Sequence, residues 1–166
     1  WGVVWVEDDQ ILREAHGADP ATTNNRMELT AAIEALSEIR DLPGRVAVYT
    51  DSTYVIKGIS EWIWGWRRRG WKTAEGNEVL NRDLWERLAD LVDARGKGGI
   101  EWHYVRGHVG TPGNERVDEI ADTLARHGEV EEKIDPRLQV FAQTLTRLGR
   151  AGMTGVLPGH ELAWLD

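Results

Sequence analysis

The stretch RVAVYTDSTYVIKGI, residues 45–59, decides the fold class of this chain. Its first half is rich in Val and Tyr and predicts a β-strand that ends at Asp51. Its second half predicts a helix that begins directly where the strand ends. A strand, a sharp turn and a helix in succession are typical of α/β proteins, so we expect an α/β fold.

The neighbouring segments add further strands and helices without any internal repeat. Alternation of apolar and polar residues identifies the strands, and apolar stripes at helical spacing identify the helices. The predicted strands are 2–7, 11–15, 45–51 and 100–105, and the predicted helices are about 25–40, 51–59, 81–94 and 114–127. Trp85 is expected to pack inward from its helix.

Composition restricts the possible functions. The chain has 166 residues, 41% of them apolar, which suits one compact domain with a core. No run of eighteen apolar residues predicts a membrane span. The absence of Cys excludes thiolate chemistry, leaves carboxylates and His as metal ligands, and agrees with a cytoplasmic protein. The net charge of −8 opposes indiscriminate binding to a polyanion, whereas RRRGWK (67–72) is a local basic cluster.

Three carboxylates each have an ordinary structural interpretation. Glu28 fits a capping box with Asn25 at the start of its helix. Asp51 fits a helix N-cap, and Asp118 fits a solvated helix face. The functional alternative is that such side chains converge, because open α/β sheets bind ligands outside the carboxyl ends of their strands.

Taken together, six motifs resemble those of bacterial type 1 ribonuclease H in order and spacing. They are TTNNRMEL (22–29), TDSTYV (50–55), WIWGWRRRGWKT (62–73), DLWERL (83–88), WHYVRGHVG (102–110) and NERVDEIA (114–121). The resemblance covers residues 1–127. It implies the ribonuclease H-like α/β fold, with a mixed five-stranded sheet flanked by helices.

The resemblance also implies a function. Members of the family cut the RNA strand of RNA/DNA hybrids, leaving 5′-phosphate and 3′-hydroxyl ends, with four carboxylates holding two Mg²⁺ ions. Glu28, Asp51 and Asp118 match three of these carboxylates, and His108 matches an accessory residue for proton transfer or product departure. Mg²⁺ prefers hard oxygen ligands, and Mn²⁺ is the alternative ion.

The fourth carboxylate departs from the family pattern. The family opens with a central strand that ends in Asp and leads into a Gly-rich turn, whereas this sequence starts at the second strand. HELAWLD (160–166) is strand-like and ends in Asp166, so we interpret residues 153–166 as a circularly permuted first strand. Residues 128–152 would then be a linker and an amphipathic helix. The alternative is a loose tail with an incidental Asp.

The remaining matches concern the substrate. Seven residues resemble the family's basic protrusion, which grips the DNA strand. They are Trp62, Trp66, Arg67, Arg68, Arg69, Trp71 and Lys72. Their ordinary interpretation is Trp side chains in a helix–helix core beside solvated cations. Asn24 and Asn25 match positions that contact the hybrid near the cut.

The sequence therefore predicts a monomeric, sequence-nonspecific hybrid endonuclease that does not bind membranes. One competing hypothesis is a catalytically impaired hybrid-binding module, which would follow if Asp166 is not the fourth carboxylate. A second is a related two-metal nuclease acting on DNA.

Overall fold

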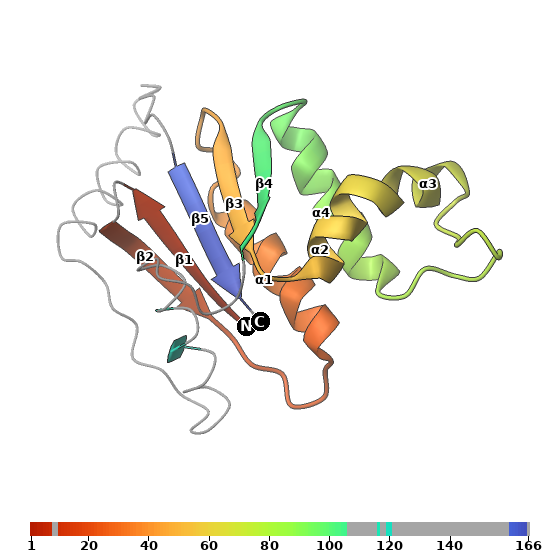
Figure 1. Cartoon of the computed structure of the whole chain (residues 1–166), viewed down its shortest axis with the longest axis horizontal. Helices are drawn as coiled ribbons and strands as arrows, with labels where there is room; N and C mark the ends of the chain where they lie inside the picture. Colours follow the sequence, from red (N-terminus) through yellow and green to blue (C-terminus); the bar gives the residue numbers. More distant parts are fainter. Residues whose placement is uncertain (8–9, 106–115, 117–118, 121–159, 166) are drawn as a thin grey trace.

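The computed structural model describes residues 1–7, 10–105, 116, 119–120 and 160–165. It contains a five-stranded sheet in the order β2-β1-β5-β3-β4, which confirms the predicted mixed α/β architecture. The strands are β1 (Gly2–Glu7), β2 (Gln10–His16), β3 (Val46–Thr50), β4 (Ile100–Tyr104) and β5 (His160–Leu165). The helices are α1 (Asn24–Glu38), α2 (Thr53–Lys57), the π-helical η1 (Gly58–Trp62), α3 (Ile63–Arg68) and α4 (Arg82–Arg95). Figure 1 shows β5 in the middle of the sheet.

Strand β5 joins two halves of the sheet that are built differently. On one side it pairs antiparallel with β1, with Gly2 opposite Leu165. On the other side it pairs parallel with β3, with Thr50 opposite Trp164. Because β4 is also parallel to β3, the carboxyl ends of β3, β4 and β5 meet at one edge of the sheet.

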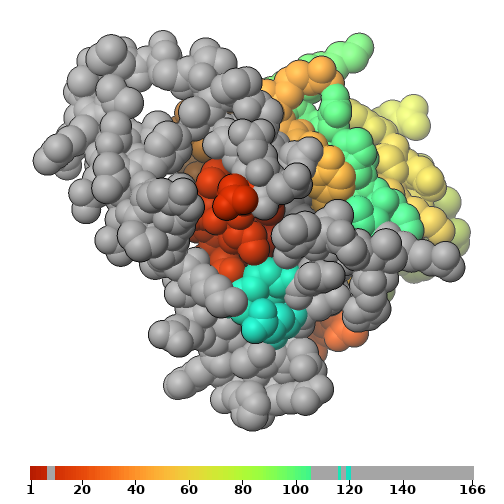
Figure 2. All heavy atoms as spheres, turned by 60° about the vertical axis from the view of Figure 1, so that its left-hand side comes forward, coloured from red at the N-terminus to blue at the C-terminus, as the bar shows by residue number. Residues whose placement is uncertain are grey.

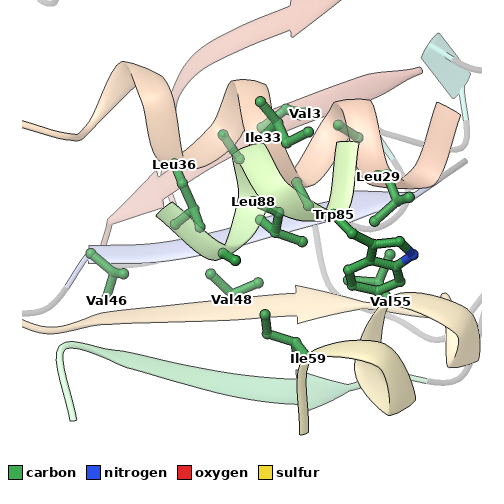
Figure 3. Close-up of a cluster of buried hydrophobic side chains, with 14 of the residues drawn as sticks. Val3, Leu29, Ile33, Leu36, Val46, Val48, Val55, Ile59, Trp85 and Leu88 are labelled. Carbon is green, nitrogen blue, oxygen red and sulfur yellow. The ribbon is translucent and has the colours of Figure 1, made fainter. Parts of the chain in front are cut away.

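The main core lies between the sheet and the helices α1 and α4. The apolar stripe of α1 includes Leu29, Ile33 and Leu36, whose exposed fractions are 0%, 0% and 1%. These side chains belong to one buried cluster with Val46 and Val48 of β3 and the buried side chains of α4 (Figure 3). Full burial of each such aliphatic side chain stabilises the fold by roughly 1.5–3 kcal/mol. Trp85, expected to pack inward, is fully buried.

Two predicted helix starts are corrected by the structure. The N-cap of α1 is Thr23, whose hydroxyl accepts from the backbone N–H of Arg26, so the predicted capping box of Asn25 with Glu28 is wrong. The N-cap of α2 is Ser52 rather than Asp51. In both cases a neighbouring hydroxyl of similar capping propensity takes the position.

Parts of the predicted architecture lie outside the described residues. Of the predicted helix 114–127, the structure describes Arg116, Glu119 and Ile120, all with helical backbone. The amphipathic segment within 136–152 is not among the described residues. Within the part of the chain that is described, no helix has both the length and the apolar character needed to cross a membrane.

Candidate active site

Asp51 lies directly after β3, at the edge where the parallel strands end. Its side chain is half-buried. The preceding residue, Thr50, is fully buried, and its carbonyl and hydroxyl oxygens both accept hydrogen bonds that fix the end of β3. Its carbonyl accepts from the N–H of Val105 at 3.0 Å, and its hydroxyl accepts from the N–H of Ser52 at 3.1 Å. Asp51 is therefore on a rigid turn at the sheet edge where α/β proteins bind ligands.

Glu28 is brought to the same turn by Ser52. It is the fifth residue of α1 and only 8% exposed, and the Ser52 hydroxyl donates a hydrogen bond to its Oε2 atom. The same Ser52 oxygen accepts from the N–H of Val55 at 3.1 Å and thereby caps α2. The Ser52 side chain thus links Glu28 of α1 to the turn that carries Asp51.

The other predicted catalytic residues, His108, Asp118 and Asp166, lie outside the described residues. Within the described ranges, no group of three or more His, Asp or Glu side chains could hold a metal ion. The described part of the site therefore presents Glu28 and Asp51. Their carboxylate oxygens fit a hard divalent cation such as Mg²⁺ or Mn²⁺.

Asn24 and Asn25 begin α1, and both are exposed. The adjacent Arg26 anchors this end of the helix to the start of α4. Its guanidinium donates to the two carboxylate oxygens of Asp83 at 3.1 and 2.8 Å, and to Oδ1 of Asn81 at 3.3 Å. The hydrogen bond from Arg26 lowers the pKa of Asp83 below its ordinary value. The exposed Asn pair is thus presented by a fixed helix end.

An aromatic cluster supports the predicted substrate-binding segment. Trp66 packs against Trp62 and Trp85 with ring centroids 5.6 and 5.4 Å apart, and Tyr54 packs against Trp62 and Trp85 at 6.0 and 5.3 Å. The Tyr54 hydroxyl accepts from Nε1 of Trp85 at 3.0 Å. Trp62 and Trp66 are half-buried, so part of each ring serves the packing and part faces outward.

The basic residues of this segment differ in their partners. Arg67 forms an ion pair with Asp93 at 2.7 Å, and Trp71 packs at the edge of the core with a positive φ of 64°. Arg68 and Lys72 are exposed, and neither forms an ion pair with another residue of the described part. Two of the predicted cations are therefore available to an external anion.

Two features of the site region were not predicted. Ser52 could have been recognised, because a Ser directly after Asp51 is an equally good helix cap. The second feature is a buried ion pair between Glu14 and Arg116, which are separated by 102 positions. No local pattern indicates a partner at that separation.

Comparison with known proteins agrees with this architecture. The family model described as RNase H matches residues 1–126. A protein named ribonuclease H from Thermosynechococcus vestitus is 56% identical over 128 residues, covering 76% of this chain and 78% of the relative. The ribonuclease H of Halorhodospira halophila is 52% identical over 122 residues, covering 74% of this chain and 78% of the relative.

A solved structure is also similar. The crystal structure of LC9-RNase H1, described as a type 1 RNase H with the type 2 active-site motif, has a TM-score of 0.63 and 31% sequence identity. The match covers 95% of this chain and 76% of that chain. The resemblance noted from the six motifs is confirmed: the chain belongs to the ribonuclease H family of enzymes.

Proposed function

We propose that this chain is an endonuclease that hydrolyses the RNA strand of RNA/DNA hybrids without sequence specificity, leaving 5′-phosphate and 3′-hydroxyl ends. The observation that carries the proposal is the hydrogen bond by which Ser52 ties Glu28 to the turn that carries Asp51, at the carboxyl end of β3 in a chain of this family. We propose that it acts as a monomer in the cytoplasm.

Four carboxylates would hold two Mg²⁺ ions, with Mn²⁺ as the alternative. They are Glu28, Asp51, Asp118 and Asp166. Bound there, the ions would activate the attacking water and stabilise the leaving 3′ oxygen. Four carboxylates packed closely would repel one another without a cation, so the proposed donor set itself favours metal binding.

The topology of β5 supports the inclusion of Asp166. Because β5 runs parallel to β3 with Trp164 opposite Thr50, the carboxyl ends of both strands lie at the same edge of the sheet, and Asp51 and Asp166 follow these two strands in the sequence. Residues 153–166 would then be the family's first strand in a permuted position. In this proposal residues 1–127 form the rest of the domain, and residues 128–152 connect the two parts.

The other residues have supporting roles. Ser52 orients the Glu28 carboxylate by donating a hydrogen bond to it. His108 would assist proton transfer or product departure. Asn24 and Asn25, exposed at the fixed end of α1, would contact the hybrid where a 2′-hydroxyl distinguishes RNA from DNA.

The basic segment would bind the DNA strand through its phosphates and sugars. Arg68 and Lys72 are exposed cations suited to phosphates. The outward parts of Trp62 and Trp66, with Trp71 and Arg67 beside them, would contact sugars and bases. Such contacts position a backbone without sequence readout.

The test is cleavage of an end-labelled RNA/DNA hybrid in Mg²⁺, with double-stranded DNA and double-stranded RNA of the same sequence as substrate controls. Asp51→Asn and Asp166→Asn remove one proposed ligand each. Asp41→Asn removes a carboxylate that is 94% exposed, and it serves as the matched control. EDTA is added in a parallel reaction.

We expect the parent and Asp41→Asn to cut the RNA strand of the hybrid alone, and the two ligand variants to bind hybrid without cutting it. Binding of hybrid without cleavage by any form would favour a hybrid-binding module. Cleavage of double-stranded DNA would favour a DNA nuclease. Full activity of Asp166→Asn would remove that residue from the proposed ligands.

A further inference from the structure

Glu14 and Arg116 form a buried ion pair that the proposed chemistry does not use. Glu14 of β2 is 3% exposed and Arg116 is 8% exposed. The Arg116 guanidinium donates from Nε to Oε1 of Glu14 at 2.7 Å and from Nη2 to Oε2 at 3.0 Å. Its Nη1 atom also lies 2.7 Å from Oε2 of Glu119. The guanidinium thus contacts two carboxylates, those of Glu14 and Glu119.

The pair lies on the face of the sheet opposite α1. Val3 and Trp5 belong to the core cluster beneath α1, and side chains alternate along a strand. Glu14 is opposite Val4 in the β1–β2 register and therefore points to the other face. Arg116 covers this face, and in Figure 2 the described atoms of residues 116, 119 and 120 (teal) lie beside the first strands (red).

A buried pair of this kind is a costly way to stabilise a fold. Removing two charges from water opposes much of their mutual attraction, and an apolar pair of similar volume is often as stable. A bidentate ion pair, unlike an apolar contact, fixes the relative orientation and register of the two segments that it joins. The hydrogen bonds that Arg116 donates to Glu14 raise the pKa of the guanidinium above its ordinary value.

We propose that Glu14 and Arg116 are positioning residues: their ion pair fixes Arg116 on the sheet, two positions before the proposed ligand Asp118, and thereby sets how tightly the site binds its divalent cation. The inference rests on the proposed function. Asp118 is two residues beyond Arg116, a span of at most about 7 Å of chain. Ile120, fully buried two residues further on, anchors the other side but gives no directional bond.

The mechanism requires only a small displacement. Ligands of a metal site act within tight geometric limits, and loss of a partner that orients a ligand costs about 10- to 100-fold in metal affinity or activity. If the Glu14–Arg116 pair is lost, Ile120 is still a buried apolar anchor, but no directional hydrogen bond then fixes Arg116 against β2. Hybrid binding, which depends on other elements, should change little.

The decisive variant replaces the pair by apolar residues. In Glu14→Leu/Arg116→Met no buried charge is left without a partner, so stability should recover relative to Glu14→Gln alone. The matched control is Glu38→Gln, which breaks the ion pair that the neighbouring Arg13 forms from β2 to α1. Arg116→Lys keeps the charge and loses the bidentate geometry, and it is available if the double variant does not fold.

Four quantities are measured on the full chain: the urea midpoint, the Kd for Mg²⁺ by calorimetry, kcat and KM on the hybrid, and hydrogen exchange of the amides at 116–120. We expect the double variant to keep the parent's urea midpoint and KM. Its Mg²⁺ Kd should rise and its kcat should fall by about tenfold or more, with faster exchange at 116–120. Glu38→Gln should match the parent in all four.

The outcomes separate this inference from the proposed function. A parent that neither binds Mg²⁺ nor cleaves hybrid overturns both. A parent that cleaves, together with a double variant that has the parent's Mg²⁺ Kd, kcat and exchange, overturns only the positioning role and leaves the pair a structural contact. Loss of activity in Arg116→Lys with an unchanged Mg²⁺ Kd also contradicts it.

Discussion

Replacement of Gly58 by Ala should destabilise the protein, although Ala favours helices. Gly58 has right-handed helical dihedrals, φ −59° and ψ −48°, so backbone strain plays no part. A Cβ atom added there would lie 1.9 Å from Cη2 of Trp85, and 2.4 and 2.7 Å from Cζ2 and Cζ3. The shortest distance is about 1.6 Å less than the 3.5 Å at which carbon atoms pack favourably.

The magnitude follows from the immobility of the ring. Trp85 is fully buried, packed by Tyr54 and Trp66, and its Nε1 donates to the Tyr54 hydroxyl. Overpacking of this kind costs about 1–3 kcal/mol, and we take the upper end because the contact is with a rigid ring. The helix propensity of Ala offsets about 1 kcal/mol. A net loss of about 2 kcal/mol corresponds to a Tm lower by about 4–8 °C.

Gly65→Ala is the matched control in the same helical segment. Its Cβ would meet the end of the Arg69 side chain at 2.9 to 3.3 Å, and an exposed guanidinium can move away. We expect no loss, or a gain of up to about 1 kcal/mol. The assay is urea unfolding followed by circular dichroism. Trp85→Phe should reduce the cost of Gly58→Ala in a double-mutant cycle. Equal stability of the two Gly variants would refute the packing argument.

Three further predictions concern individual contacts. Ser52→Ala should lower the free energy of unfolding by about 1–2 kcal/mol in urea, because it removes the α2 cap, whereas Ser52→Thr, which keeps the oxygen, should not. Arg26 lowers the pKa of Asp83 in the folded protein. The pair therefore stabilises the fold fully at pH values above the unfolded-state pKa of about 3.9. This stabilisation is lost as the pH falls through the lower folded-state pKa. Asp83→Asn should therefore cost up to about 1 kcal/mol at pH 7 and nothing in strong acid; a Tm difference that persists there would contradict this. Arg68→Ala and Lys72→Ala, measured by anisotropy in EDTA, should each reduce the salt slope of hybrid binding by up to about 0.9; an unchanged slope would exclude a phosphate contact.

The spacing of apolar residues predicted most of the helices and strands, because that spacing depends only on residues close together in the sequence. The stripe of Leu29, Ile33 and Leu36 has the helical period, and the alternation of Val46 and Val48 has the strand period. Local preference made both Asp51 and Ser52 acceptable caps of α2 and did not decide between them, since their intrinsic preferences are similar. The use of Ser52 as the cap is consistent with the hydrogen bond that its hydroxyl donates to Glu28, a residue distant in sequence.

Long-range features could be predicted only in outline. The composition of residues 160–165 indicated a strand, and its pairing with both β1 and β3 agrees with the expected place in the sheet. The ion pair of Glu14 with Arg116 depends on two segments meeting across 102 positions, and neither residue stands out in its local pattern. Burial of charge is a property of the assembled fold, so it left no periodic signal.

The central place of β5 has a consequence for biosynthesis. A ribosome produces β1 to β4 and all the described helices before it produces residues 160–165. Until then β1 and β3 lack the strand that lies between them in the folded sheet, so the edges that they present to β5 are unpaired. Open edges of this kind can pair with other chains. The synthesis of β5 is therefore the step at which chaperones or a slow translation rate would most affect the yield of folded protein.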